Sequence, residues 1–139
     1  MVPSTWLSHM YVTLLDVPDY RTAIQEAHRV LRPGGLFAVC NLDPMVLAGL
    51  GWIKHGSEKL HYKLDDYFDE TVRHLELSGG PVDNFHRTLS SYVNAFLDAG
   101  FIIEGIREPK PTDEQVARLP AIADNLRVPE FIVYLLRKP

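Results

Sequence analysis

The stretch Arg29–Leu42, with the sequence RVLRPGGLFAVCNL, joins the end of a helix directly to a strand. Asp19 is placed to cap this helix. Apolar residues recur at helical spacing from there to the end of the helix. Pro33 and the pair Gly34–Gly35 stop the helix. The near-continuous apolar run Leu36–Leu42 is typical of a strand that is buried on both faces, as in a parallel sheet.

The C-terminal part of the chain repeats this alternation of helix and strand. Thr88 is placed to cap a helix with one apolar stripe, which Gly100 ends, and the run FIIEGI then predicts a strand. The pair Thr112 and Gln115 has capping-box spacing and predicts a further helix, which Pro120 shortens or kinks. The run EFIVYLL predicts the last strand. This alternation indicates an α/β layer architecture.

The middle of the chain lacks such a pattern. We expect one domain, residues 1–139, in which residues 1–44 and 88–139 form the regular parts and residues 45–87 form an irregular insert. The aromatic residues of the insert suit either a lid over an apolar ligand or packing of the insert onto the sheet, and packing is the favoured interpretation. These residues are Trp52, Tyr62, Tyr67, Phe68 and Phe85.

Composition excludes several classes of protein. The formal net charge of −4 argues against nucleic-acid binding, which normally requires a basic face. No apolar run is long enough to span a bilayer, and Cys40, the single cysteine, excludes an intrachain disulfide and agrees with a cytoplasmic location. The spacing of His55, His61 and His74 corresponds to no compact set of metal ligands, so we expect no metal site.

Several stretches resemble the class I S-adenosylmethionine-dependent methyltransferases of the small-molecule type. LDVPDYRTAIQEAHRVLRPGGLFAVCNLDP resembles the region after the fourth strand of that family. HRTLSSYVNAFLDAGFIIEGIREPKP and VPEFIVYLLRKP resemble its later helix, turn and final strands. The resemblance covers Leu14–Pro139 apart from the insert. It implies a truncated Rossmann-like fold, with a mostly parallel sheet of three or four strands, flanking helices and an antiparallel last strand.

The resemblance is to the C-terminal half of the family alone. The family's glycine-rich turn and the acidic residue that binds the ribose of the cofactor belong to an earlier part of its fold, and neither is found here. The only G-x-G is Gly49–Gly51, which follows no acidic strand end and is interpreted as part of the insert. We therefore leave open whether this chain alone binds S-adenosylmethionine, which is the cofactor that the resemblance implies.

The resemblance also implies where the cofactor contacts lie. In the family, the loop after the fourth strand lies beside the methionine end of the cofactor. The corresponding residues in this chain are Ser8, His9, Met10 and Tyr11.

Other candidate residues surround the expected acceptor. Asn41 and Asp43 follow the strand after the RPGG turn, at the sheet edge where ligands of open α/β folds bind. Asp43 can orient or deprotonate an acceptor, or it can be an ordinary turn residue. His86 is the best candidate for a base, with Arg87 beside it as a substrate contact, although a histidine near a helix start is also common on surfaces. Tyr62 of the insert is a further candidate substrate contact.

Two functions follow from these observations. The first is S-adenosylmethionine-dependent methyl transfer to a small-molecule acceptor. The second is a non-catalytic binding or assembly module, or one half of a split methyltransferase whose N-terminal half is a separate polypeptide. In either case a half sheet leaves an apolar edge and face exposed, so we expect a homodimer.

Overall fold

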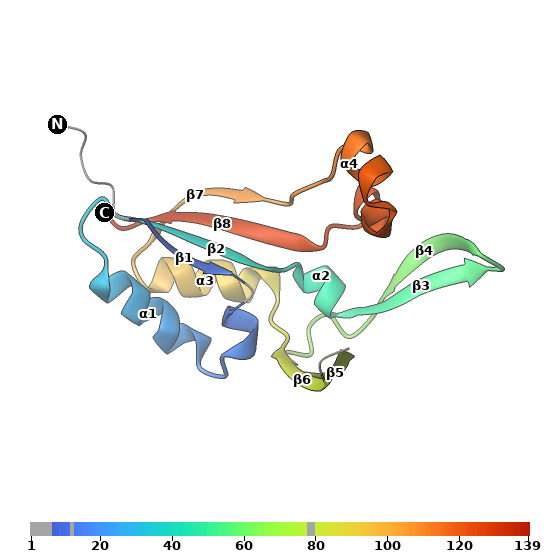
Figure 1. The fold of residues 1–139 in the computed structure, drawn as a ribbon. Helices are drawn as coiled ribbons and strands as arrows, with labels where there is room; N and C mark the ends of the chain where they lie inside the picture. Colours follow the sequence, from blue (N-terminus) through green and yellow to red (C-terminus); the bar gives the residue numbers. More distant parts are fainter. Residues whose placement is uncertain (1–6, 12, 78–79) are drawn as a thin grey trace.

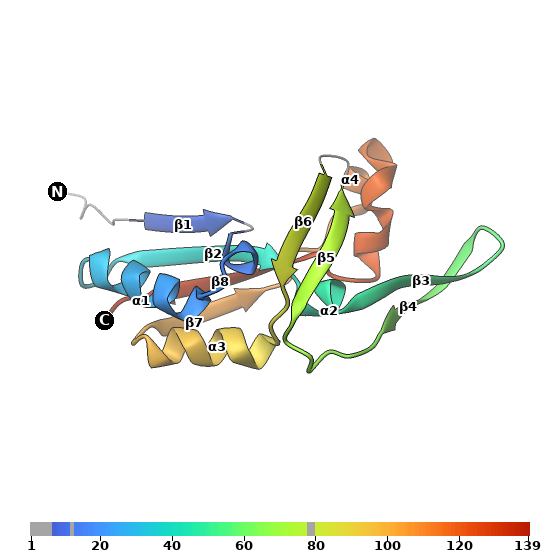
Figure 2. The ribbon, with the colours of Figure 1, turned by 90° about the horizontal axis from the view of Figure 1, so that it is seen from below.

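The computed structural model describes residues 7–11, 13–77 and 80–139 of the chain. A central sheet carries the two long helices on one face, and two hairpins extend beyond one end of the sheet (Figure 1 and Figure 2). In the described residues, no helix is long and apolar enough to cross a membrane.

The central sheet has four strands in the order β1-β2-β8-β7. β1 (Leu7–Tyr11) pairs in parallel with β2 (Leu36–Leu42). β8 (Phe131–Arg137) runs antiparallel between β2 and β7 (Ile102–Arg107), so β1, β2 and β7 all point the same way. The antiparallel last strand is confirmed. The expected mostly parallel pairing is confirmed only for β1 with β2, because β8 opposes both of its neighbours.

Helices α1 (Tyr20–Val30) and α3 (Leu89–Asp98) cover one face of the sheet (Figure 2). Both predicted caps are confirmed: the Asp19 carboxylate accepts from the Thr22 N–H at 3.1 Å, and the Thr88 hydroxyl accepts from the Ser91 N–H at 3.1 Å. The core between helices and sheet contains Leu14, Tyr20, Ile24, Leu31, Phe37, Val39, Tyr92, Ala95, Phe96, Phe101, Ile132, Tyr134 and Leu136.

The opposite face of the sheet is apolar and carries neither of the long helices (Figure 1). Alternate residues of β2, such as Ala38 and Cys40, point to this face and are only partly buried. Tyr11, Ile102 and Leu135 add larger exposed apolar side chains. Since sheets of α/β proteins normally have both faces covered, this face is a candidate interaction surface.

The insert is more regular than its sequence indicates, and the expectation of an irregular segment was wrong. It contains α2 (Pro44–Leu47), the hairpin of β3 (Gly49–His55) with β4 (Glu58–Leu64), and the hairpin of β5 (Val72–Leu77) with β6 (Gly80–Phe85). The β3–β4 hairpin has two register shifts. Such bulges break the two-residue alternation by which strands are recognised in a sequence.

The segment between β7 and β8 follows the prediction. α4 (Asp113–Arg118) begins with the complete Thr112–Gln115 capping box and ends before Pro120. The chain then continues as the 3-10 helix η2 (Pro120–Leu126). A further 3-10 helix, η1 (Leu14–Asp16), precedes α1.

The RPGG turn is held by the C-terminal end of the chain. Gly34 has a φ of 77°, a left-handed conformation that side chains disfavour. Its N–H donates to the Lys138 carbonyl at 2.9 Å, and the Lys138 N–H donates to the Gly35 carbonyl at 2.9 Å. The Lys138 ammonium donates to the carbonyls of His28 and Leu31 at 2.7 and 2.8 Å. Lys138 therefore caps the C-terminal end of α1 with a positive charge.

We predict that Lys138→Met lowers the free energy of unfolding by about 1 to 2 kcal/mol, because two carbonyls at the end of α1 lose a charged donor. Urea unfolding at neutral pH measures this difference. The matched control is Lys54→Met on the exposed β3 strand, for which we expect a change within about 0.5 kcal/mol. Equal stability of Lys138→Met and the wild type would show that the cap contributes nothing.

Candidate functional site

The carboxyl ends of β1, β2 and β7 lie at one end of the sheet, because these three strands point the same way. Ligands of open α/β sheets bind outside this end. Asn41 and Asp43 are located there at the end of β2, and Glu108 follows β7. The hairpins of the insert and the start of α3 adjoin the same end (Figure 2).

Asp43 is buried and caps α2. Its carboxylate accepts from the Met45 N–H at 2.9 Å, and its own N–H donates to the Glu130 carbonyl at 2.8 Å. Burial raises the pKa of Asp43, the Met45 N–H opposes that shift, and the carboxylate of Glu108 raises the pKa further. Asp43 therefore has a structural role at the helix start, and its action on an acceptor stays a prediction.

His86 is buried two residues before Thr88, the N-cap of α3. Its Nε2 lies 2.7 Å from the Tyr67 carbonyl, which can only accept, so Nε2 carries the proton. Burial lowers the pKa of His86, although the hydrogen bond to Tyr67 opposes this shift. The imidazole is therefore neutral near pH 7 with its lone pair on Nδ1, which has no hydrogen-bond partner among the described residues. This is the protonation state that a general base requires.

Arg87 is buried, and its guanidinium binds the backbone that precedes α1. It donates to the carbonyls of Leu14, Val17 and Pro18 at 2.8, 2.6 and 2.9 Å. The guanidinium also lies 4.1 Å from the centre of the Tyr20 ring, within the range of a cation–π interaction. The guanidinium is therefore already bound by groups of the same chain, and the role of Arg87 as a substrate contact stays a prediction.

A loop of the insert, residues 67–70, is bound to the start of α3. The Glu70 carboxylate accepts from the Thr88 N–H at 2.7 Å, the Thr88 hydroxyl at 2.9 Å and the Ser91 hydroxyl. The Leu89 N–H donates to the Tyr67 hydroxyl at 2.9 Å. Burial disfavours the charged form of Glu70, but the hydrogen bonds from Ser91 and Thr88 outweigh it and lower the pKa.

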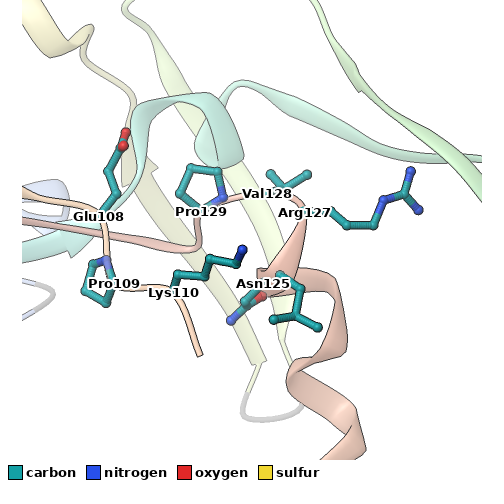
Figure 3. Close-up of a pocket in the computed structure, with 8 residues that line it drawn as sticks. Glu108, Pro109, Lys110, Asn125, Arg127, Val128 and Pro129 are labelled. Carbon is teal, nitrogen blue, oxygen red and sulfur yellow. The ribbon is translucent and has the colours of Figure 1, made fainter. Parts of the chain in front are cut away.

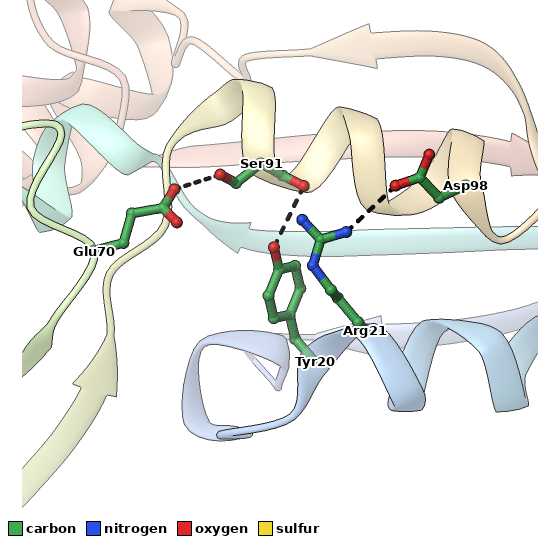
Figure 4. A network of polar contacts seen from close by, with 5 residues as sticks. All are labelled: Tyr20, Arg21, Glu70, Ser91 and Asp98. Carbon is green, nitrogen blue, oxygen red and sulfur yellow. Dashed lines mark hydrogen bonds and ion pairs between the residues drawn. The ribbon is translucent and has the colours of Figure 1, made fainter.

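The same turn of α3 is joined to α1, as Figure 4 shows. The Tyr20 hydroxyl donates to the Ser91 carbonyl at 3.5 Å, and Arg21 forms an ion pair with Asp98 at 3.4 Å. Ser91 therefore contacts Glu70 of the insert through its side chain and Tyr20 of α1 through its backbone. This arrangement fixes the start of α3, which His86 precedes by three residues, between the insert and α1.

The predicted cofactor contacts lie on β1 itself, so their expected position in the loop after that strand was wrong. Ser8, His9 and Tyr11 are exposed, and Met10 is partly buried against the core. The Tyr11 ring lies 6.2 Å from the Phe131 ring, between centroids. Their role toward a cofactor stays a prediction.

Tyr62 lies away from the start of α3 and packs within the insert. Its hydroxyl donates to the Val46 carbonyl at 3.5 Å, and its ring lies edge-on to Trp52 at 5.4 Å. A Cβ atom at Gly49 would come within 2.2 Å of the Tyr62 ring, so this glycine permits the close packing. For Tyr62, the structure therefore agrees with the interpretation that the insert's aromatic residues serve packing. A substrate contact by Tyr62 stays a prediction.

A pocket of about 180 Å³ lies between the end of β7 and η2 (Figure 3). Glu108 and Lys110 line one side of it, and Asn125 and Val128 line the other. In the part of the chain that the structure describes, no group of three or more His, Cys, Asp or Glu side chains could hold a metal ion.

Sequence reasoning missed three polar groups of this region. Glu70 gave no signal, because its partners are 18 and 21 residues away. Tyr92 lies in the apolar stripe of the helix predicted after Thr88, and Tyr134 lies in the run EFIVYLL of the last predicted strand. Their hydroxyls are buried without hydrogen-bond partners among the described residues. The one available signal was a hydroxyl within an otherwise apolar face.

Solved structures with the same fold include S-adenosylmethionine-dependent methyltransferases. One, from Mesorhizobium loti, has a TM-score of 0.82 and 29% identity, with 95% of this chain and 61% of that protein covered. A protein of Listeria monocytogenes assigned provisionally to this class has a TM-score of 0.78 and 28% identity, with 96% and 60% covered. A Haloferax volcanii methyltransferase in complex with its Trm112 activator has a TM-score of 0.57 and 17% identity, with 96% and 53% covered.

The resemblance to S-adenosylmethionine-dependent methyltransferases is therefore confirmed: the chain has the structure of part of such an enzyme. It spans about three fifths of the length of the first two proteins. No family model and no curated protein sequence matches the chain.

We predict that Glu70→Gln lowers the free energy of unfolding by about 1 kcal/mol at pH 7, because its hydrogen bonds lose their charge and the helix start loses an anion. The folded-state pKa lies below the ordinary 4.5, so this stabilisation is present above pH 4.5 and lost as the pH falls through the folded-state pKa. Urea unfolding between pH 7 and pH 3 measures it, with Glu58→Gln on the exposed hairpin as control. A difference that persists undiminished at pH 3 would contradict the charged contact.

A second prediction concerns His86. Because its pKa is lower in the folded state than the ordinary 6.5, the unfolded state takes up a proton first as the pH falls. We therefore expect wild-type stability to fall between about pH 6.5 and pH 5, and His86→Gln to lose less over that range. Unfolding at pH 7.5 and pH 5.5 measures the two losses, with the exposed His55→Gln as control. Equal losses in wild type and His86→Gln would show that His86 is not the titrating group.

Proposed function

We propose that the protein takes part in the transfer of a methyl group from S-adenosylmethionine to a small molecule at the carboxyl end of the central sheet. The observation that carries this proposal is the likeness to the Mesorhizobium loti methyltransferase over 95% of the chain. The single cysteine supports a cytoplasmic location. The acidic net charge supports a small molecule rather than a nucleic acid as acceptor.

The residues of β1 suit one part of the cofactor. Ser8 and His9 present exposed polar side chains, and Tyr11 presents an exposed ring at the end of the strand. These groups could contact the methionine end of S-adenosylmethionine, which supplies an activated methyl group when bound. β1 carries no carboxylate for the ribose hydroxyls, so we propose that these hydroxyls are bound by residues outside β1.

The groups near α3 suit the acceptor. Displacement at a methyl group requires above all that the acceptor is positioned and shielded from water. Asn41 and Asp43 at the end of β2 are buried and can orient the acceptor. Neutral His86 can take a proton from it on Nδ1, because Nε2–H is fixed on the Tyr67 carbonyl. The loop at residues 67–70 contacts His86 through the Tyr67 carbonyl and can shield it from solvent.

We predict that isothermal titration of the chain with S-adenosylmethionine shows micromolar binding, and that His9→Ala weakens it by about tenfold through the loss of one polar contact. His55→Ala on the distant hairpin is the control. No detectable heat at millimolar cofactor would reject a cofactor site in this chain alone.

The second candidate function is a binding or assembly module. The observation that favours it is the open edge of β1 together with the exposed apolar face of the sheet. The face could pair two copies of the chain or receive a separate polypeptide that supplies the N-terminal half of the fold. The Haloferax volcanii methyltransferase of the same fold is itself found in a complex with an activator.

Light scattering after size-exclusion chromatography separates these possibilities. If the protein is an assembly module that dimerises, the measured mass should be twice the 15.8 kDa of the chain. The variant Leu135→Lys, on the exposed face of the sheet, should then have the mass of the monomer. Leu60→Lys on the β3–β4 hairpin is the control and should remain dimeric. A wild-type chain that is monomeric and binds cofactor would exclude the module.

A further inference from the structure

Four buried side chains have polar atoms without hydrogen-bond partners among the described residues. They are Asn41, with both amide atoms, His86 with Nδ1, and the hydroxyls of Tyr92 and Tyr134. All four side chains belong to residues that are 0 to 2% exposed. The other unpartnered atoms of this kind, in His28 and Arg73, belong to residues that are less buried.

The four residues occupy one region. Asn41 of β2 faces Ile132 of β8, and Val39 faces Tyr134, so Asn41 and Tyr134 are diagonal neighbours on the buried face of the sheet. The Tyr92 ring of α3 lies 6.0 Å from the Tyr134 ring. On the side of the insert, the Tyr67 ring lies 5.7 Å from the His86 ring. Burial raises the pKa of the Tyr134 hydroxyl most, and Tyr92, Asp43 and Tyr67 act on it in the same direction.

Such a grouping opposes folding. Each buried polar group without a partner costs roughly 1 to 3 kcal/mol, and native structures keep such groups rare. Residues of apolar shape would fill the same positions at no such cost. Groups that are unfavourable for the fold and gathered at one place are typical of a functional site.

The charges around these four residues select the kind of ligand. The nearest buried cation is Arg87, whose guanidinium donates to three backbone carbonyls and also opposes the rise that burial causes in the pKa of the Tyr92 hydroxyl. Asp43 lies within electrostatic range of Tyr134 and disfavours a negative ligand. Among the described residues, the one buried cation is therefore already hydrogen-bonded to the backbone, so the region favours an uncharged polar group over a phosphate, sulfate or carboxylate.

The surroundings are aromatic. Phe96 lies 5.0 Å and Tyr92 lies 6.0 Å from the ring of Tyr134, between centroids. Rings at these distances favour edge or offset contacts with a further ring. We propose that Asn41, His86, Tyr92 and Tyr134 form a binding site for a small aromatic molecule that carries an uncharged hydroxyl or carboxamide group.

The ligand's polar group exchanges hydrogen bonds with these side chains. Its O–H or N–H donates to His86 Nδ1 or Asn41 Oδ1, and its oxygen accepts from Asn41 Nδ2 or the Tyr134 hydroxyl. The loop at residues 67–70 is hydrogen-bonded to the start of α3 beside His86, so entry of the ligand would require these hydrogen bonds to open. This inference rests on the proposed methyl transfer only in naming the ligand as its acceptor, since binding itself needs no cofactor.

The test uses the chain without S-adenosylmethionine and three aromatic probes: phenol, and the isosteric pair benzamide and benzoate. Ligand-observed NMR competition and isothermal titration measure binding. We expect phenol or benzamide to bind at least about tenfold more tightly than benzoate, and Asn41→Leu to weaken that binding by about tenfold or more. Because Asn41→Leu removes a buried amide without partners, its melting temperature should equal or exceed that of the wild type. Asn94→Leu on the exposed side of α3 is the matched control and should leave binding unchanged.

Three results would overturn the inference: no binding by either uncharged probe, benzoate binding as tight as theirs, or unchanged binding in Asn41→Leu. If Asn41→Leu does not fold, the amide is required by the fold itself, and Tyr134→Phe then decides, with Asn94→Leu kept as the control. Probe binding without cofactor binding would reject methyl transfer by this chain but keep the site. Cofactor binding without probe binding would reject the site for the aromatic ligand but leave methyl transfer by this chain in place.

Discussion

The buried guanidinium of Arg87 is the interaction on which the arrangement of the other parts depends. It joins the end of the insert to the backbone of residues 14–18, about seventy residues earlier in the chain. A buried charge is tolerated only when its donors are used, and here three carbonyls and the Tyr20 ring use them. Without Arg87, the three carbonyls would lose their partners as well. The contact therefore fixes η1, the start of α1 and the start of α3 as one unit.

The position of the candidate site follows from this unit. His86 precedes Arg87 and Thr88 follows it, so the base candidate and the helix cap are placed by the same buried side chain. Glu70 then binds the insert to that helix start, where its negative charge complements the helix dipole. The polar groups at the end of β2 face this assembly from the sheet. Arg87 and Glu70 stabilise this region through their hydrogen bonds, whereas the buried polar atoms of Asn41 and Tyr134 have no partner among the described residues.

The parts of the fold that depend on local sequence were predictable. Asp19, Thr88 and the Thr112–Gln115 pair cap helices where their spacing indicates, and the RPGG turn separates α1 from β2. The hairpins of the insert were not predictable, because bulges break their alternation. Cofactor contacts were expected in a loop at residues that lie on β1, since a short strand near a chain end carries little periodicity.

The site was predictable only in outline. Asn41, Asp43 and His86 were located by the resemblance and by their positions after a strand or before a helix. Their surroundings depend on contacts between distant residues, such as Glu70 with Ser91 or Tyr92 with Tyr134, which no local pattern indicates. Tyr134 is an example: within EFIVYLL it is a core residue like its neighbours, and only the structure shows that its hydroxyl has no partner among the described residues.

The central claim is that the carboxyl end of the β1–β2 pair is the ligand site of a methyltransferase fold. The most direct test is a titration of the ¹⁵N-labelled chain with S-adenosylmethionine, followed by the backbone amide signals of each residue. The structure predicts that the signals of Ser8–Tyr11 and Asn41–Asp43 shift in a saturable way, while those of the β3–β4 hairpin do not. Absence of shifts at millimolar cofactor, or shifts confined to other parts of the chain, would contradict the claim.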